Sequence, residues 1–314
     1  MKKIVSIVLL LISLCGCKKV EEIVDYNYSD MGIVSPTGAP SLVFINCLDD
    51  PTFETNTNPK NIISMMNSNS DKRIVVMDTI AGLKAIRNGA PYKLAFNITF
   101  GNFYLAATGN DDDYTLNSND NIVVFGDTGA FLFKYLYGEN FNSIEMVASV
   151  SDAAKCLATG KNLETDTVVD YVLVAEPVLT TTLNNQDLPT YGKSYIYSNI
   201  QELYKEKTSS SYVQASVFIK DDGYIQDFND YANYFETNVD LLLSNQEYVE
   251  EILKVNDDEE TKNIFGIGSN MIKQVLKTNS VNIGFKKAID NKEAIDYLLN
   301  LQGIEITNEE EYFK

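Results

Sequence analysis

The 314-residue sequence contains no histidine and no tryptophan. Without histidine the chain cannot carry a Ser-His-Asp or Cys-His catalytic set, a histidine-ligated zinc, or the side chain that usually moves protons near neutral pH. An enzyme built on this sequence would have to use carboxylates, lysine or tyrosine. We therefore expect a protein that is not an enzyme and that uses no metal and no cofactor.

Positive charge is also scarce in the sequence. There are 25 lysines and arginines against 44 aspartates and glutamates, which gives a formal net charge of -19. Nucleic acid binding needs a basic face, so the charge excludes nucleic acid as a partner. It predicts a well-solvated acidic surface instead.

A long apolar run occurs only at the N-terminus. Residues 1–16 read "MKKIVSIVLLLISLCG", with two lysines before an apolar stretch of about eleven residues. A helix that spans a bilayer needs roughly 20 apolar residues, so this stretch is typical of a secretory signal peptide. The sequence therefore predicts an extracytoplasmic protein whose signal peptide is residues 1–16.

The signal peptide is followed directly by a cysteine in the pattern Leu14-Cys15-Gly16-Cys17. This pattern resembles the cleavage box of bacterial lipoproteins. The resemblance implies that Cys17 is acylated, for example with palmitate, that residues 17–27 form a lipidated tether, and that only this lipid contacts the cell membrane. The alternative is a plain secretory signal in which Cys17 is an ordinary residue.

Two cysteines remain in the mature chain, Cys47 and Cys156. They could pair in an oxidising compartment. Each lies in an apolar helical pattern far from the other in sequence, which favours two separate buried thiols.

Strand-like and helix-like segments alternate over most of the chain. This alternation predicts an α/β protein with parallel sheets and helices on both faces. After the last predicted strand, 213–219, only helical patterns follow. The other predicted strands are 31–34, 73–77, 92–97, 102–108, 121–125, 144–148 and 171–174, and the predicted helices before 213 are 39–48, a helix from 60, 80–88, 130–137 and 151–159.

Three of the predicted strand-to-helix turns combine a hydroxyl or carboxylate side chain with glycine. Ligands of α/β sheets bind beyond the carboxyl ends of the strands, where helix starts offer free backbone N–H groups. The alternative is simple N-capping, because Ser, Thr and Asp are preferred caps. The turns are Ser35-Pro36-Thr37-Gly38, Asp78-Thr79-Ile80-Ala81-Gly82 and Gly126-Asp127-Thr128-Gly129.

An ordered set of segments extends over nearly the whole mature chain and resembles a known family. The segments include "GIVSPTGAPSLVF", "FGNFYLAATG", "NIVVFGDTGAFLFKYL" and "DYVLVAEPVLTTTL". They resemble the substrate-binding proteins of ABC importers, in the branch for nitrate, sulfonate, taurine and thiamine precursors. The resemblance implies a type II periplasmic-binding-protein clamshell, with two α/β lobes joined by two hinge crossovers.

The resemblance also implies the limits of the lobes and the partners. Lobe one would be 28–103 plus 220–314, and lobe two 104–219 with the hinge strands, with crossovers near 103–107 and 214–218. A monomer would capture a small-molecule solute between the lobes and deliver it to an ABC permease and its ATPase. The ligand residues implied by position are Ser35, Thr37, Gly38, Asp78, Thr79, Phe100, Gly101, Asn102, Asp127, Thr128, Gly129 and Glu176.

Two of these assignments have alternatives, and so does the ligand. Glu176 could cap the following helix, and Phe100 could be a core residue rather than a stacking platform. If Asp78 and Asp127 both face the ligand, they repel an oxyanion and favour a neutral or cationic solute, such as a pyrimidine-type thiamine (vitamin) precursor or another small polar solute.

Other functions remain open from the sequence. A nitrate-, sulfonate- or taurine-type oxyanion could still be held by helix N-termini and hydroxyls. The chain could also be a surface lipoprotein that acts as an adhesin or partner-binding module. An enzyme on the same fold is disfavoured by the absence of histidine and by the signal peptide.

Overall fold

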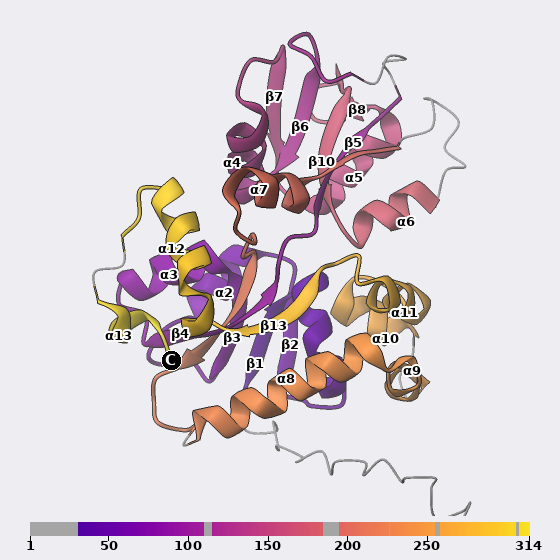
Figure 1. Ribbon diagram of the computed structural model, residues 1–314. Helices are drawn as coiled ribbons and strands as arrows, with labels where there is room; N and C mark the ends of the chain where they lie inside the picture. The colour runs from indigo at the N-terminus through magenta and orange to yellow at the C-terminus, as the bar shows by residue number, and fades with distance from the viewer. Residues whose placement is uncertain (1–30, 110–114, 185–194, 226, 255–257, 306–307) are drawn as a thin grey trace, which may run out of the picture.

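The computed structural model describes residues 31–109, 115–184, 195–225, 227–254, 258–305 and 308–314. The predicted signal peptide, the tether and Cys17 lie outside the described residues. The described chain forms two larger sheets, one above the other in Figure 1, and helices pack on the faces of each. The mixed α/β class predicted from the sequence is confirmed.

The first sheet has six strands in the order β13-β4-β12-β3-β1-β2. Strands β1, β2 and β3 are parallel, as expected, but β12 runs antiparallel to β3 and β4, and β13 runs antiparallel to β4. The expectation of wholly parallel sheets was therefore wrong. The bounds are β1 Ile33–Pro36, β2 Phe53–Asn56, β3 Ile74–Asp78, β4 Tyr92–Thr99, β12 Ala215–Lys220 and β13 Ile283–Lys287.

Side chains alternate between the two faces of this sheet. On one face Ile33 and Ile74 pack in a core that includes residues of α8, α9 and α11. On the other face Val34 and Val75 pack with residues of α2, α3 and α12. These helices are α2 Pro59–Met65, α3 Thr79–Arg87, α8 Phe228–Ser244, α9 Gln246–Lys254, α11 Ser269–Thr278 and α12 Lys292–Leu301.

The second sheet has five strands in the order β11-β5-β10-β6-β7. The parallel part is β10, β6 and β7, whereas β5 runs antiparallel to β10 and β11. Helices α5 and α6 cover one face, and α4 and α7 the other. The bounds are β5 Phe103–Ala107, β6 Asn121–Phe125, β7 Ser143–Val147, β10 Tyr171–Ala175, β11 Tyr195–Asn199, α4 Gly126–Tyr137, α5 Val150–Thr159, α6 Val178–Asn184 and α7 Ile200–Thr208.

Two short connections join the sheets. One leads from Thr99, the end of β4, to Phe103, the start of β5, and the other from Thr208, the end of α7, to Ala215, the start of β12. Both lie in the middle of Figure 1, between the two sheets. The limits of the lobes stay a prediction. The remaining elements are η2 Ala39–Cys47, η3 Ile289–Asn291, α10 Asp258–Phe265, α13 Glu309–Tyr312 and the hairpin β8 Lys161–Asn162 with β9 Thr167–Val168.

Several details differ from the sequence prediction. The helix expected at 39–48 is a 3₁₀ helix with a kink at Phe44. The region after 219 contains a strand, β13, although only helices were expected there. Its pairing with β4 is interrupted between Ile283 and Lys286, and this short, irregular ladder leaves no clear alternation in the sequence.

The two mature cysteines behave as the sequence favoured. Cys47 and Cys156 are both free and buried. Burial is the main cause that raises the pKa of each thiol, so both are poor nucleophiles at neutral pH. No helix among the described residues is long and apolar enough to cross a membrane.

Candidate functional site

Two of the three predicted turns meet where the two sheets face each other. Asp78 ends β3 and caps α3, because its Oδ1 accepts the Ala81 N–H at 2.9 Å. Its Oδ2 accepts a hydrogen bond from the Thr128 hydroxyl at 3.1 Å, and Thr128 lies in the first turn of α4 on the second sheet. The capping interpretation therefore applies to Asp78, and its place in a ligand site stays a prediction.

The environment of Asp78 disfavours its charge. Burial raises the pKa of Asp78 above its usual 3.8, while the hydrogen bonds from Ala81 and Thr128 act in the opposite direction. The Tyr212 hydroxyl has a pKa well above its usual value, first because of burial and second because of the Asp78 carboxylate. Asp78 is therefore a hydrogen-bond acceptor in a low-dielectric setting rather than a freely solvated anion.

Gln214 links several predicted residues at the connections between the sheets. Its carbonyl oxygen accepts the Thr79 N–H at 2.9 Å, and its Oε1 accepts the Asn102 N–H at 3.0 Å. Its own N–H donates to the carbonyl oxygen of Thr99 at 3.0 Å. We call this region, residues 99–104 and 212–216 with Glu176 and Gln201, the joint.

Glu176 is buried at the joint, but its carboxylate is occupied locally. Its Oε1 accepts the Thr180 hydroxyl at 2.6 Å, and its Oε2 accepts the Thr180 N–H at 3.0 Å. Its backbone carbonyl accepts the Asn102 side-chain amide at 2.6 Å. The structure thus gives Glu176 the capping role that was the alternative, and its backbone holds Asn102.

The first predicted turn is not bonded to the other two. Ser35 is fully buried, and its hydroxyl donates to the Pro36 carbonyl oxygen at 3.2 Å. The Thr37 N–H donates to Asn56 of β2, and Gly38 has a φ of 108° with open space where a Cβ would lie. Parallel pairing of β1 with β3 places this turn and Asp78 at the same sheet edge.

The remaining predicted residues lie around the same edge. Phe100 is half-buried, and the ammonium of Lys286 lies 5.9 Å from the centre of its ring. Asp127 is exposed in the first turn of α4. Gly129 is buried, and a Cβ there would lie 3.0 Å from Leu173.

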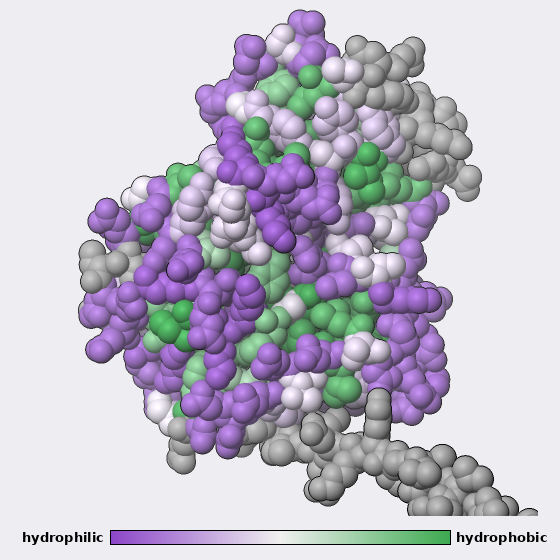
Figure 2. All heavy atoms as spheres, viewed as in Figure 1, coloured by the Kyte–Doolittle hydropathy of each residue, from purple (hydrophilic) through white to green (hydrophobic). Residues whose placement is uncertain are grey.

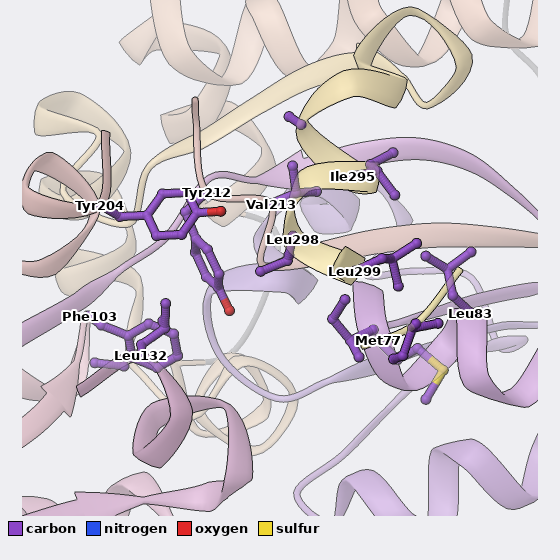
Figure 3. Close-up of a cluster of buried hydrophobic side chains, with 14 of the residues drawn as sticks. Met77, Leu83, Phe103, Leu132, Tyr204, Tyr212, Val213, Ile295, Leu298 and Leu299 are labelled. Carbon is purple, nitrogen blue, oxygen red and sulfur yellow. The ribbon is translucent and has the colours of Figure 1, made fainter. Parts of the chain in front are cut away.

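Aromatic side chains fill part of the space between the sheets. The rings of Tyr204 and Tyr212 meet edge to face with 5.3 Å between their centres, and the ring centres of Phe103 and Tyr212 are 6.3 Å apart (Figure 3). Tyr297 of α12 faces Tyr135 of α4, with 3.2 Å between their hydroxyl oxygens. One continuous apolar cluster thus includes side chains from both sheets.

Two hollows in the described surface lie away from the predicted residues. One of about 370 Å³ is lined by Gly32, Arg73 and Lys220, among others, at the opposite edge of the first sheet. The other, of about 310 Å³, lies at Arg87 and Asn300. Most of the face seen in Figure 2 is hydrophilic, with smaller hydrophobic areas.

Sequence reasoning did not identify Gln201, Tyr212 or Gln214 as site residues. The carboxamide oxygen of Gln201 accepts the Phe103 N–H at 3.0 Å. Gln214 was visible only as a polar residue inside the predicted strand 213–219, and that position was assigned to a crossover. Nothing local marks Gln201, because its role depends on a residue 98 positions away.

Comparison with known proteins gives structural matches only. No family model matches the chain, and no curated protein matches it. An ABC transporter structure from Parabacteroides distasonis matches with a TM-score of 0.65 and 16% identity, covering 86% of this chain and 90% of that one. The periplasmic aliphatic sulphonate binding protein SsuA of Escherichia coli matches with a TM-score of 0.59 and 10% identity, covering 90% and 91%.

A Candida albicans protein described as having the generic periplasmic binding protein fold matches with a TM-score of 0.52 and 12% identity, covering 89% of this chain and 92% of that one. The chain has the periplasmic binding protein fold. Identities this low establish the fold alone. Within this fold, the Asp78–Thr128 contact and the joint lie where the two sheets face each other.

Proposed function

We propose that the protein is an extracytoplasmic solute-binding lipoprotein that captures a small molecule between its two sheets and delivers it to an ABC importer. The observation that carries the proposal is the Asp78–Thr128 hydrogen bond, which joins two ligand-type turns from different sheets. Similarity in fold to an ABC transporter structure and to a sulphonate-binding protein supports it.

In this proposal lobe one is 28–103 plus 220–314, and lobe two is 104–219 with the hinge strands. Of these, β12 pairs within the first sheet and so joins lobe two to it. The two connections act as hinges, and a bound solute stabilises the closed arrangement. The lipid on Cys17 holds the protein at the membrane near the permease and its ATPase. The protein acts as a monomer and catalyses no reaction.

The proposed ligand is a small, neutral, polar solute, of which a pyrimidine-type vitamin precursor is one example. The half-buried carboxyl group of Asp78 and the buried carboxyl group of Glu176 disfavour an anion beside them. The ammonium of Lys286 near Phe100 provides a positive charge at one side of the same region. A sulfonate, as bound by the Escherichia coli protein, is therefore the second ligand class to test.

A second function has specific support. Asp78 and Glu176 are occupied as caps, and Tyr204, Tyr212 and Tyr297 fill space between the sheets. If these side chains always fill the space between the sheets, no solute can enter it. The protein would then act as a surface partner-binding lipoprotein instead.

A thermal-shift screen of the chain from residue 18 onward separates the two functions. A solute present at 100 times its dissociation constant stabilises the folded protein by about 2.7 kcal/mol. We expect at least one small polar solute to raise the melting temperature in proportion to the logarithm of its concentration. Absence of any such solute across vitamin precursors, sulfonates and amides would favour the partner-binding function.

A further inference from the structure

Two side-chain amides at the joint each bury one polar atom without a hydrogen-bond partner among the described residues. These atoms are Oδ1 of Asn102 and Nε2 of Gln201. The residues are 3% and 8% exposed, respectively. Buried polar atoms without partners are rare in proteins and costly, so each calls for an explanation.

The orientation of both amides is fixed by their other atoms. Nδ2 of Asn102 donates to the Glu176 carbonyl oxygen at 2.6 Å, so the unpartnered atom is the acceptor. Oε1 of Gln201 accepts the Phe103 N–H at 3.0 Å, so the unpartnered atom is the donor. Flipping either amide would place two donors or two acceptors against each other.

The two amides are also held near each other. Gln201 is bonded to Phe103, the residue directly after Asn102. At Gly101, the residue directly before Asn102, a Cβ would lie only 2.9 Å from Cβ and Oε1 of Gln201. Burial raises the pKa of Tyr104, and a contact with the Gln201 amide acts in the opposite direction, but Nε2 of Gln201 makes no hydrogen bond of normal distance and angle to it. Asn102 therefore offers a free acceptor, and Gln201, which is bonded to the next residue, offers a free donor.

We propose that these two atoms recognise a neutral solute through an amide-type edge. An N–H of the solute donates to Asn102 Oδ1, and a carbonyl oxygen or ring nitrogen beside it accepts from Gln201 Nε2. The inference rests on the proposed solute-binding function and names the ligand class for it. A carboxylate or sulfonate lacks the donor that Asn102 requires and would lie near the buried Glu176.

The test compares Gln201→Met with Asn238→Leu. Each removes a buried side-chain amide whose nitrogen has no hydrogen-bond partner among the described residues. Only Gln201 lies at the joint, because Asn238 belongs to α8. Binding of uracil, 2-pyrrolidone and nicotinamide, with taurine and glycine betaine as comparators, is measured by ligand-observed NMR, and molecules that copurify from the host are identified by native mass spectrometry.

We expect an amide-edge molecule to bind the natural protein and the Asn238→Leu variant, and to bind the Gln201→Met variant about 10- to 100-fold more weakly. Thermal unfolding shows whether both variants fold. If Gln201→Met does not fold, Gln201→Glu keeps the acceptor for Phe103 and, above neutral pH, replaces the donor by an acceptor, with the same loss expected.

Four results would overturn the inference. If Gln201→Met and Asn238→Leu lose affinity equally, or if the bound molecule has no donor beside an acceptor, the ligand class is wrong and the solute-binding function stands. The same holds if a crystal structure of the complex shows an ordered water bonded to both amides. If neither the probes nor any copurified small molecule binds, the proposed function fails as well.

Discussion

The Asp78 carboxylate bonds to residues of both sheets. Asp78 is the last residue of β3, and its carboxylate caps α3 by accepting the Ala81 N–H and also accepts a hydrogen bond from the Thr128 hydroxyl of the second sheet. Burial raises its pKa. A carboxylate in this position contributes acceptors rather than net attraction, so its charge is a cost to the folded state.

Replacing Asp78 by Asn tests this cost. The pKa of Asp78 is higher in the folded chain than in the unfolded chain. The contribution of Asp78 to the free energy of unfolding therefore falls as the pH rises above about 4, and it stops falling above the folded-state pKa. Asn keeps a capping acceptor and cannot ionise. We therefore expect the stability of Asp78→Asn relative to the natural protein to increase from acid to neutral pH in urea unfolding. A flat profile for Asp78→Asn would contradict the argument.

Gly101 is required by both its backbone conformation and its close neighbours. Its φ is +96°, and Gly89 has nearly the same φ, +93°, with nothing within 4 Å of an added Cβ. Gly101→Ala should therefore reduce the free energy of unfolding by about 1–3 kcal/mol more than Gly89→Ala does. Equal losses in denaturant titrations would show that Gln201 does not pack closely against Gly101.

From the sequence, the turns that lie close together were easier to predict than the role of each side chain in them. Asp78 and Thr128 follow predicted strands, and the sheet topology brings their turns together. The local pattern at Glu176-Pro177 suited both capping and binding, and only the neighbouring Thr180 groups decide for capping. Gln201 and Tyr212 act through contacts distant in sequence, which no local pattern encodes.

At the scale of elements, a chain of buried polar side chains crosses the middle of the first sheet. The Thr79 and Ser216 hydroxyl oxygens are 2.6 Å apart, and the Asn97 amide donates to Ser216 at 2.9 Å. The Asn291 amide donates to Asn97 at 2.8 Å. These bonds connect α3, β12, β4 and the start of α12 and fix their relative positions.

Ser216→Ala should be costly because it leaves the Asn97 amide without this acceptor in a fully buried position. We expect a loss of about 1–3 kcal/mol in the free energy of unfolding. The matched change Ser244→Ala removes an exposed hydroxyl that bonds within α8 and should cost less than about 0.5 kcal/mol. If both changes reduced the free energy of unfolding in guanidinium by similar amounts, the buried hydrogen bonds of Ser216 would not stabilise the fold.

The elements themselves were predictable to different degrees. Apolar strands such as β3 and β10 are buried on both faces and are visible as short apolar runs. Strand direction was not predictable, because β12 and β5 are about as apolar and as buried as the parallel strands β3 and β10, and only the tertiary connections reverse them. β13 is short and irregularly paired, so its strand character depends on β4.

At the scale of the whole molecule, the described residues of the two sheets make few side-chain hydrogen bonds to each other away from the joint. Besides Asp78–Thr128, the Tyr104 hydroxyl donates to the Ser280 carbonyl oxygen at 3.3 Å, and Tyr135 meets Tyr297. The hydrogen bond to Tyr297 is the main cause that raises the pKa of Tyr135 to about 12. Tyr135 therefore stays protonated across the physiological pH range.

Thr128→Val removes the hydroxyl that reaches Asp78 while keeping the side-chain shape. A loss of about 1 kcal/mol would shift an open–closed equilibrium roughly fivefold toward the open form. We expect a larger radius of gyration than for the natural protein in small-angle X-ray scattering without added solute. Thr237→Val, whose hydroxyl bonds only to the Asn233 carbonyl in α8, is the control. An unchanged radius in both variants would show that this bond does not hold the sheets together.

The central claim is that a small solute binds between the two sheets, at the joint. The most direct measurement is a crystal structure of the protein purified from its own host. The account predicts electron density for a small molecule at the joint, within hydrogen-bond distance of Asn102 or Gln201. A structure in which Tyr204, Tyr212 and their neighbours fill this space, with the protein's solute bound elsewhere or with none bound, would contradict it.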